Sequence, residues 1–221
     1  PIQLGEVDYS LSCSIGILQG IDGYSNPEDI VRDVDIAMYH AKESGKSRIE
    51  VFDVDMRTEG EFRQKIEKRL AYAVKNQELV VHYQPIYELG AGQIWGIEAL
   101  VRWQHPQLGL LAPGEFIPLA EKTGLIDDID WFVLKTAIRQ RNEWLSSFSE
   151  LGDLRLCVNV SVNELKSTKF LTNLQALLAQ NGSHAGKLLL ELPAERFHRL
   201  ADLKPSLERL HSFGVGLGVD D

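Results

Sequence analysis

Side chains with oxygen ligands follow three apolar segments in the second half of this chain of 221 residues. They are Asn159 after "LRLCV", Glu191 after "KLLL", and the adjacent Asp220 and Asp221 after "GVGLGV". Carboxylate and amide oxygens are the hard ligands that magnesium or manganese requires. This pattern therefore points to metal-assisted chemistry at the ends of buried segments.

A fourth segment, "GIEALVRW", adds a carboxylate and a guanidinium. In a strand the side chains alternate, so Glu98, Leu100 and Arg102 share one face of this segment. A planar guanidinium suits a phosphate because it donates two parallel hydrogen bonds. A metal ligand and a phosphate-binding group are thus predicted on the same side of one strand.

Each of these residues also has a purely structural interpretation. Glu98 and Arg102 are candidates for an ion pair, Asn159 for the cap of a helix beginning near Asn163, and Glu191 for a residue that simply ends a strand. Taken singly, each residue fits the structural interpretation better. Taken as a group, they favour metal binding, because several buried polar side chains at such positions must find partners.

Alternating strands and helices are predicted to position these residues. Strands are expected near 79–87, 94–103, 154–162, 187–192 and 215–220, and helices near 113–123, 128–147, 163–181 and 200–213. Such alternation is typical of an α/β fold with a mainly parallel sheet, and α/β barrels place their active sites at the carboxyl ends of the strands. A complete barrel needs about 200 to 250 residues. We therefore expect residues 79–221 to form an incomplete TIM-like (β/α) barrel.

The first quarter of the chain has the pattern of one strand, one helix and a second strand. Residues 9–17 alternate so that one face is apolar, which predicts a half-buried strand with Tyr9, Leu11, Cys13, Ile15 and Ile17 on its inner side. Asn26 and Pro27 predict the start of a helix that ends at Gly45, with an apolar stripe of Ile30, Val31, Val34, Met38 and Ala41. A second strand is expected within residues 47–53. These elements make too small a core to stand alone, so we expect residues 1–53 to be the tail of a domain that began upstream and residues 54–78 to be a connecting helix.

Composition limits the partners and the compartment. A formal net charge of −9 argues against broad binding to DNA, RNA or an anionic membrane, although a local site for a phosphorylated small molecule is compatible with it. Cys13 and Cys157 lie in strand-like surroundings and are expected to be buried thiols in a reducing cytoplasm. No run approaches about 18 apolar residues, so any membrane anchor is expected outside this sequence.

The residues also resemble a known family. The segment "YQPIYELGAGQIWGIEALVRWQHPQLGLLAPGEFIPLAEKTGLI" strongly resembles the EAL domain of bacterial cyclic di-GMP phosphodiesterases, with the naming triplet at Glu98, Ala99 and Leu100. The resemblance continues through "VNVS", "LLLELP" and "VDD", so it covers residues 79–221. It implies a TIM-like barrel that hydrolyses one phosphodiester bond of cyclic di-GMP with Mg²⁺ or Mn²⁺ and releases linear pGpG.

The same resemblance implies a role for each candidate residue. The implied metal ligands are Glu98, Asn159, Glu191, Asp220 and Asp221, among which Glu98 and the two aspartates would form the catalytic group. The implied contacts with the dinucleotide are Gln84, Leu100 and Arg102. Two metals activate water and stabilise a leaving oxygen, so the implied chemistry agrees with the residue types.

Residues 1–53 resemble the end of a GGDEF domain, the diguanylate cyclase fold, through "SCSIGI" and "DVDIAMYHAKESGKSRIEVFD". Lys42 matches a lysine that contacts GTP phosphates in that family, and Lys46 stands where the family usually has arginine. Two solvated lysines at a helix end are an equally good interpretation. Because the GGDEF signature itself lies upstream, no cyclase site is expected in this chain.

One departure from the EAL pattern leaves a second function open. Where the family has a glutamate that supports the loop after the double aspartate, this chain has Ala194, and Glu195 stands one position later. The leading hypothesis is that this is a segment of a composite GGDEF-EAL signalling protein whose EAL domain hydrolyses cyclic di-GMP. A homodimer with upstream sensory domains is the expected form of the full protein. The segment alone, which stops after the double aspartate, is expected to be inactive. The alternatives are a catalytically silent receptor for cyclic di-GMP and a full protein that is chiefly a cyclase.

Overall fold

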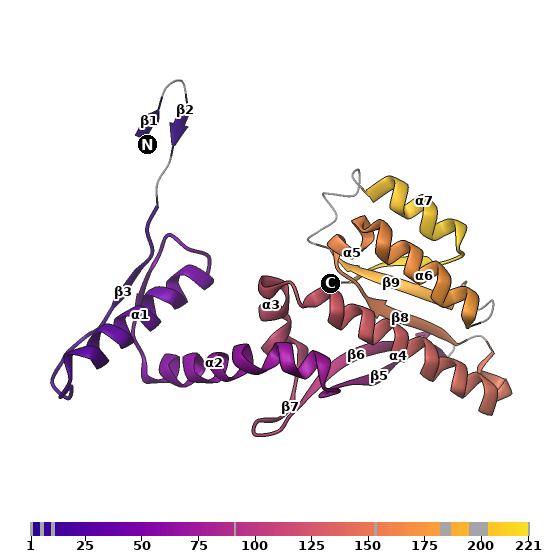
Figure 1. The fold of residues 1–221 in the computed structure, drawn as a ribbon, viewed down its shortest axis with the longest axis horizontal. Helices are drawn as coiled ribbons and strands as arrows, with labels where there is room; N and C mark the ends of the chain where they lie inside the picture. The colour runs from indigo at the N-terminus through magenta and orange to yellow at the C-terminus, as the bar shows by residue number, and fades with distance from the viewer. Residues whose placement is uncertain are drawn as a thin grey trace. The chain divides into compact units, whose positions relative to one another are not determined.

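The computed structural model describes residues 2–4, 7–9, 12–90, 92–152, 154–181, 187–194 and 203–220. The chain divides into two compact units, Pro1–Lys68 and Arg69–Asp221. The described elements of the first unit are β1 Ile2–Leu4, β2 Val7–Tyr9, β3 Ile15–Ile17, α1 Pro27–Glu43, β4 Ile49–Val51 and the greater part of α2 Val54–Lys75. Strands β1 and β2 pair antiparallel, whereas β3 and β4 pair parallel with α1 between them in the chain (Figure 1).

Helix α1 begins as its sequence predicts. The Asn26 side chain accepts a hydrogen bond from the Glu28 amide at 3.1 Å, and Pro27 occupies the first helical position. The apolar stripe differs from the prediction, since Val31 is 61% exposed. Ala41 of the predicted stripe is fully buried, and so are Asp33 and Ala37, which the prediction did not include.

The half-buried strand predicted for residues 9–17 is wrong in two respects. Regular strand structure covers only Val7–Tyr9 and Ile15–Ile17, and the apolar side of β3 is exposed, at 42% for Ile15 and 38% for Ile17. The face that packs against α1 is the one carrying Gly16, where an added Cβ would lie 2.3 Å from the Met38 amide nitrogen. Because only glycine permits this approach, the helix covers the face opposite to the isoleucines. Cys13, predicted to be buried, is exposed.

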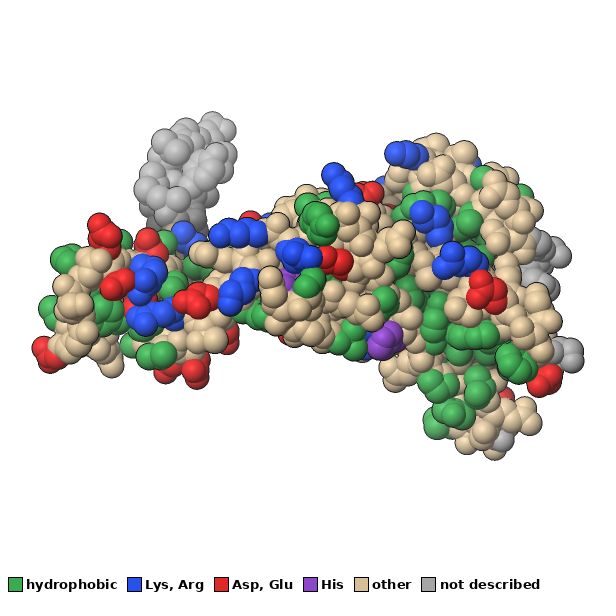
Figure 2. Space-filling model, turned by 60° about the horizontal axis from the view of Figure 1, so that its bottom comes forward, with side chains coloured by type: hydrophobic (Ala, Val, Ile, Leu, Met, Phe, Trp, Pro, Cys, Tyr) green, Lys and Arg blue, Asp and Glu red, His purple; other side chains and the backbone are tan. Residues whose placement is uncertain are grey.

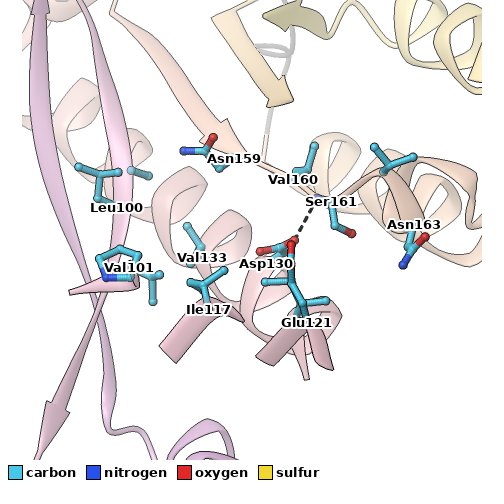
Figure 3. A pocket seen from close by; sticks show the side chains of 14 residues that line it. Leu100, Val101, Ile117, Glu121, Asp130, Val133, Asn159, Val160, Ser161 and Asn163 are labelled. Carbon is cyan, nitrogen blue, oxygen red and sulfur yellow. Dashed lines mark hydrogen bonds between the residues drawn. The ribbon is translucent and has the colours of Figure 1, made fainter. Parts of the chain in front are cut away.

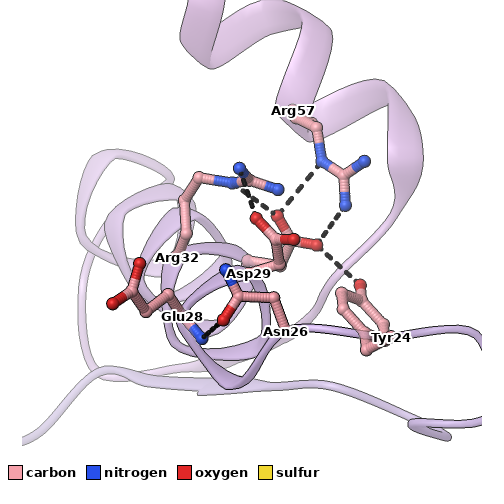
Figure 4. Close-up of polar contacts among 7 residues, drawn as sticks. Tyr24, Asn26, Glu28, Asp29, Arg32 and Arg57 are labelled. Carbon is pink, nitrogen blue, oxygen red and sulfur yellow. Dashed lines mark hydrogen bonds and ion pairs between the residues drawn. The ribbon is translucent and has the colours of Figure 1, made fainter.

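Hydrogen bonds allow the charged Asp33 to lie buried on the inner side of α1. Figure 4 shows the side chains of Tyr24, Arg32 and Arg57, which donate them. The Tyr24 hydroxyl donates to the Asp33 carboxylate at 2.6 Å, and the Arg57 guanidinium donates two hydrogen bonds, one of them from Nε at 3.1 Å. Arg32 adds a third donor at 3.3 Å. Burial alone would raise the pKa of Asp33, but the hydrogen bonds from Arg57, Tyr24 and Arg32 outweigh burial and lower it. The first turn of α2, which carries Arg57, is thereby fixed to α1.

The second unit is an α/β domain built on one sheet. Its strands are β5 Leu79–Tyr87, β6 Ile94–His105, β7 Gly109–Leu111, β8 Arg155–Asn159, β9 Leu188–Pro193 and β10 Gly216–Asp220. Its helices are the end of α2, α3 Pro113–Thr123, α4 Ile126–Ser147, the 3₁₀ turn η1 Ser149–Leu151, α5 Val162–Lys166, α6 Thr168–Gln180 and α7 Lys204–Ser212. The sheet has the order β10-β9-β8-β6-β5, with β7 also paired to β6. All nine elements predicted after residue 78 are present; the helix expected at 163–181 is divided at Ser167, whose hydroxyl caps α6.

The pairing within this sheet is mixed. Strands β6, β8, β9 and β10 run parallel, whereas β5 and β7 pair antiparallel with β6. Side chains on one face are buried, and Figure 1 shows α4 beside β6 and β8. The buried side chains on this face of β6, β8 and β9 are Ile97, Ala99, Val101, Trp103, His105, Leu156, Val158, Leu188, Leu190 and Leu192, and Val215, directly before β10, is buried as well. The main core therefore lies between the sheet and its helices, and the half-buried opposite face is left for the polar residues.

A polar cluster joins the beginning of β5 to the end of β6. The Glu78 carboxylate accepts the Trp103 indole N–H at 3.0 Å and two hydrogen bonds from Arg69, one of them from Nε at 3.0 Å. The Glu78 carbonyl accepts the Gln104 amide at 2.8 Å. The Arg69 hydrogen bonds lower the pKa of Glu78, against the effect of its burial. This cluster fixes the register of the two strands that carry Gln84 and Glu98.

Candidate functional site

The register of the sheet brings the predicted ligands together on its half-buried face. Glu98 of β6 pairs with Cys157 of β8, Asn159 pairs with Glu191 of β9, and Glu191 pairs with Gly218 of β10. Paired residues in neighbouring strands point to the same side. The Asn159 side-chain amide donates to the Glu98 carboxylate Oε1 at 3.0 Å. Three of the predicted ligands, Glu98, Asn159 and Glu191, are thus neighbours although they are far apart in sequence.

The two aspartates differ in what the structure describes. Asp220 is the last residue of β10 and lies two positions beyond Gly218, so it belongs to the same face and is exposed. Asp221 lies outside the described residues. Glu98, in contrast, is not at a strand end, because β6 continues to His105. It lies near the end of the segment of β6 that pairs with β8, Gly96–Ala99, whereas β7 pairs with β6 farther along, at 103–105.

The candidate substrate contacts lie on the same face. Gln84 of β5 pairs directly with Glu98, and Leu100 and Arg102 follow Glu98 at alternate positions. The alternative of a Glu98–Arg102 ion pair is wrong. The two residues are four positions apart in one strand, which separates their Cα atoms by about 13 Å. The Arg102 guanidinium instead donates to the Val101 carbonyl at 2.8 Å.

Ser161, and not Asn159, caps the helix that follows β8. Its hydroxyl accepts the Glu164 amide at 3.1 Å at the start of α5. The cap alternative for Asn159 is therefore wrong. Its side chain is free to turn toward Glu98, as the hydrogen bond shows.

The carboxylates on this face repel one another. Burial raises the pKa of Glu191, and the negative charges of Glu98 and Asp220 raise it further, whereas a hydrogen bond from the Cys157 thiol lowers it. Burial and the charge of Glu191 raise the pKa of Cys157 to about 12. A cation bound among these carboxylates would offset their mutual repulsion and the cost of burying them.

The donor set fits a divalent cation in its chemistry. Glu98, Asn159, Glu191 and Asp220 offer hard oxygen ligands, and Gly218 leaves space for one of them, because an added Cβ would lie 3.0 Å from Glu191 Cγ. Among the residues that the structure describes, no three His, Cys, Asp or Glu side chains are grouped closely enough to hold a metal by themselves. Mg²⁺ is often bound through one or two carboxylates together with waters, and Asn159 adds an amide oxygen to the carboxylates on this face.

A cavity of about 400 Å³ adjoins the site (Figure 3). It shares Leu100 and Asn159 with the site and extends between α3, α4 and the connection from β8 to α5. Most of its lining is apolar, from residues such as Pro113, Ile117, Ile126, Val133 and Val160. Two carboxylates, those of Glu121 and Asp130, lie among these apolar side chains. The cavity therefore suits a largely apolar group that carries hydrogen-bond donors.

Sequence reasoning missed a pair of acidic residues beside this cavity. Asp130 of α4 and Glu164 of α5 are 9% and 3% exposed, and a side-chain hydrogen bond joins them. Burial is the main cause that raises the pKa of Asp130 to about 7 and that of Glu164 to about 10. The sequence "SVNE" contained a signal, since Ser followed three residues later by Glu is typical of a helix start.

The two lysines predicted to contact phosphates belong to the first unit. Lys42 lies in the last turn of α1, and Lys46 follows that helix in a left-handed conformation with φ of 60°. Both are exposed. On the face of the molecule in Figure 2, Lys and Arg side chains are interspersed with Asp and Glu.

The fold is an α/β domain in which the candidate oxygen ligands Asn159, Glu191 and Asp220 lie at or near the carboxyl ends of parallel strands, with Glu98 beside Asn159. The model of the EAL domain family matches residues 67–221, and the chain belongs to this family. The match begins at residue 67, so a GGDEF origin for residues 1–53 stays a prediction. Among the described residues, no helix is both long and apolar enough to cross a membrane.

Curated relatives include proteins of cyclic di-GMP signalling. The bifunctional diguanylate cyclase/cyclic di-GMP phosphodiesterase MucR of Pseudomonas aeruginosa is 36% identical over 100% of this chain and 32% of its own length. The cyclic di-GMP phosphodiesterase NbdA of the same organism is 32% identical over 100% of this chain and 28% of its own length. PdeR of Escherichia coli, also a cyclic di-GMP phosphodiesterase, is 34% identical over 81% of this chain and 27% of its own length. The chain thus spans about a third or less of these relatives.

Solved structures agree on the fold. The phosphodiesterase PaMucR in complex with c-di-GMP superimposes with a TM-score of 0.66 and 35% identity, over 71% of this chain and 63% of that chain. The EAL domain of Xanthomonas citri FimX in complex with c-diGMP superimposes with a TM-score of 0.62 over 74% of this chain and 62% of that chain. Its identity of 23% supports the fold alone.

Proposed function

We propose that this chain contributes the EAL domain of a cyclic di-GMP phosphodiesterase that releases linear pGpG. The observation that carries the proposal is the convergence of Glu98, Asn159 and Glu191 on one face of the sheet, beside a cavity that shares Leu100 with that face. Membership of the EAL family and the phosphodiesterase relatives MucR, NbdA and PdeR support the same reaction.

The metal ligands in this proposal are Glu98, Asn159, Glu191, Asp220 and Asp221. When bound there, Mg²⁺ or Mn²⁺ supplies Lewis-acid activation of the phosphodiester. The protein's own part is to hold the oxygen ligands on adjacent strands. The Asn159 amide donates to the Glu98 carboxylate at 3.0 Å, and the Cys157 thiol donates to the Glu191 carboxylate. These hydrogen bonds fix the carboxylates before any ligand arrives.

The cavity is the proposed site for one guanine base of the dinucleotide. A guanine presents adjacent N–H donors on one edge, which a carboxylate accepts in pairs. Glu121 offers such an acceptor among the apolar side chains that line the cavity. Gln84 and Arg102, which lie on the sheet face with Glu98, are the proposed contacts of the phosphodiester and sugar.

We further propose the domain order expected from the sequence. Residues 1–53 would be the end of a GGDEF domain, residues 54–78 a connecting helix, and residues 79–221 part of the EAL domain. The exposure of Lys42 and Lys46 supports solvated side chains rather than a phosphate site within residues 1–53.

The proposal is tested by measuring pGpG release from cyclic di-GMP, with Mg²⁺ or Mn²⁺, in the full protein that contains this chain. Glu98→Gln removes a carboxylate charge at the site and is expected to lower the rate at least 100-fold. Glu88→Gln, an exposed glutamate in the connection between β5 and β6, is the matched control and is expected to retain the wild-type rate. No release from the wild-type protein would reject the phosphodiesterase.

A catalytically silent receptor is the second candidate, favoured by Ala194 directly after β9. The family has a loop-supporting carboxylate at this position, and the alanine side chain cannot replace it. Titration calorimetry separates the two functions. Binding of cyclic di-GMP without metal and without turnover supports the receptor, and the absence of any binding rejects both.

A further inference from the structure

The pair Asp130 and Glu164 has a property that packing alone does not require. The two carboxyl groups are buried and hydrogen-bonded to each other, which is possible only when one of them carries a proton. Glu164 Oε2 is buried and has no hydrogen-bond partner among the described residues. The pair is therefore a buried acidic group that holds a proton at neutral pH.

This pair touches the backbone that leaves the candidate metal site. Asp130 Oδ2 accepts the amide of Ser161 at 3.1 Å, and the Ser161 hydroxyl accepts the Glu164 amide at 3.1 Å. One residue earlier, the Val160 amide donates to the Glu191 carbonyl at 3.0 Å. One residue earlier still, the Asn159 side chain donates to Glu98. Each residue from Asn159 to Ser161 is thus held by a different element of the fold.

We propose that Asp130 and Glu164 are positioning residues, whose shared proton keeps the carboxyl end of β8 in place and so presents Asn159 to the site. This inference rests on the proposed function for its catalytic consequence. Its structural part, the proton-dependent hold on Ser161, stands independently of any reaction.

The surroundings explain why losing the proton releases the hold. Two acidic groups near the pair add to the repulsion: Asp127 on α4 raises the pKa of both carboxyl groups, and Glu121 on α3 raises that of Asp130. The Ser161 amide is the opposing group and favours the ionised forms. When both carboxyl groups are ionised, two buried negative charges lie side by side, and separation relieves them. Separation moves Asp130 away from Ser161 or moves α5 away from α4.

Three variants separate proton sharing from simple packing. Glu164→Gln keeps a donor toward Asp130 at every pH, because the amide does not ionise. Asp130→Ala removes the acceptor of the Ser161 amide. Asp128→Asn changes an exposed carboxylate on the same helix and is the control.

The first measurement is the pH dependence of the unfolding equilibrium constant in urea. A raised pKa means that the folded protein holds a proton that the unfolded chain has lost, so stability declines as pH rises toward the folded pKa. For each such proton the unfolding constant increases tenfold per pH unit. Between pH 7 and 9 the wild type and Asp128→Asn are expected to show this increase. In Glu164→Gln the slope of the logarithm of the unfolding constant against pH is expected to be lower by one proton. If the logarithm of the unfolding constant has the same slope against pH in Glu164→Gln and the wild type, the proposal of a shared proton is rejected.

The second measurement reports the position of β8. Asp130→Ala is expected to speed hydrogen exchange of the Ser161 amide at least tenfold relative to Asp128→Asn, and to lower kcat for cyclic di-GMP at least tenfold with little change in KM. Glu164→Gln is expected to retain kcat at pH 7 within threefold and to keep it at pH 9.5, where the wild type loses activity. Unchanged exchange in Asp130→Ala rejects the positioning role. If Asp130→Ala speeds the exchange but the wild-type protein does not hydrolyse cyclic di-GMP, only the proposed function is rejected.

Discussion

Gly218 offers the most direct test of the candidate site, because its missing side chain leaves the space that the Glu191 carboxylate occupies. An added Cβ would lie 3.0 Å from Glu191 Cγ and 3.4 Å from Oε1. Ordinary carbon contacts need about 3.5 to 4.0 Å. Gly218→Ala must therefore push the Glu191 side chain by a few tenths of an ångström.

Such a shift should change the free energy of unfolding little and the affinity for a metal ion strongly. The Glu191 side chain is flexible and moves at low cost, and alanine also reduces the entropy of the unfolded chain, so the free energy of unfolding should stay within about 1 kcal/mol of the wild type. A displaced ligand or support typically costs 10- to 100-fold in metal affinity. We expect the dissociation constant for Mn²⁺, measured by electron paramagnetic resonance, to rise about 10- to 100-fold.

Gly216→Ala is the matched control on the same strand and the same face. Its added Cβ would lie 3.0 Å from Leu189 Cδ1 and does not meet Glu191. The control should show a similar change in stability with an unchanged Mn²⁺ affinity. Equal Mn²⁺ affinities in Gly218→Ala, Gly216→Ala and the wild type would refute the assignment of Glu191 as a ligand.

Other predictions concern the polar clusters that support the two units. Glu78→Ala leaves the buried indole N–H of Trp103 without its acceptor, which should lower the free energy of unfolding by about 2 kcal/mol. Glu78→Gln keeps an acceptor and should lower it by less than half as much. Urea unfolding followed by tryptophan fluorescence measures both. Equal losses in the two variants would contradict this account. Tyr24→Phe removes a donor from the buried Asp33 carboxylate and should speed hydrogen exchange in α1; unchanged exchange would show that Arg57 and Arg32 suffice. Because the pKa of Asp33 is lowered by folding, its contribution to stability is present above the ordinary value of 3.8 and is lost as pH falls through the folded pKa, so protection of α1 against exchange should decrease in acid.

Periodicity predicted most of the second unit because local and global preferences agree there. The predicted ranges 79–87 and 113–123 coincide with β5 and α3. Side chains alternate in the first range, which predicts a strand, and the second is an amphipathic segment that starts with proline, which predicts a helix. The candidate ligands were found for the same reason. Asn159 and Glu191 directly follow runs of strand-forming residues, and parallel pairing brings such positions to neighbouring places.

Residues whose partners are distant in sequence escaped prediction. A buried aspartate within an amphipathic helix reads as a solvated residue until Arg57, 24 residues away, is placed beside it. Asp130 and Glu164 likewise depend on the packing of α4 against α5. In β3 the side that a helix covers was decided by the close approach possible at Gly16, and not by the hydrophobicity of Ile15 and Ile17.

The strand register described above has a consequence for how this domain can change during evolution. Asn159, Glu191 and Gly218 share one row across three strands, with leucine or valine as the chain neighbours of Glu191 and Gly218. Inserting or deleting a single residue within one of these strands would turn an apolar side chain into the row and bury the polar one among the helices. Length changes are therefore tolerated only in the connections between elements. We expect homologous chains to differ in length between strands and to keep the spacing within each strand constant, even where most of the side chains have been replaced.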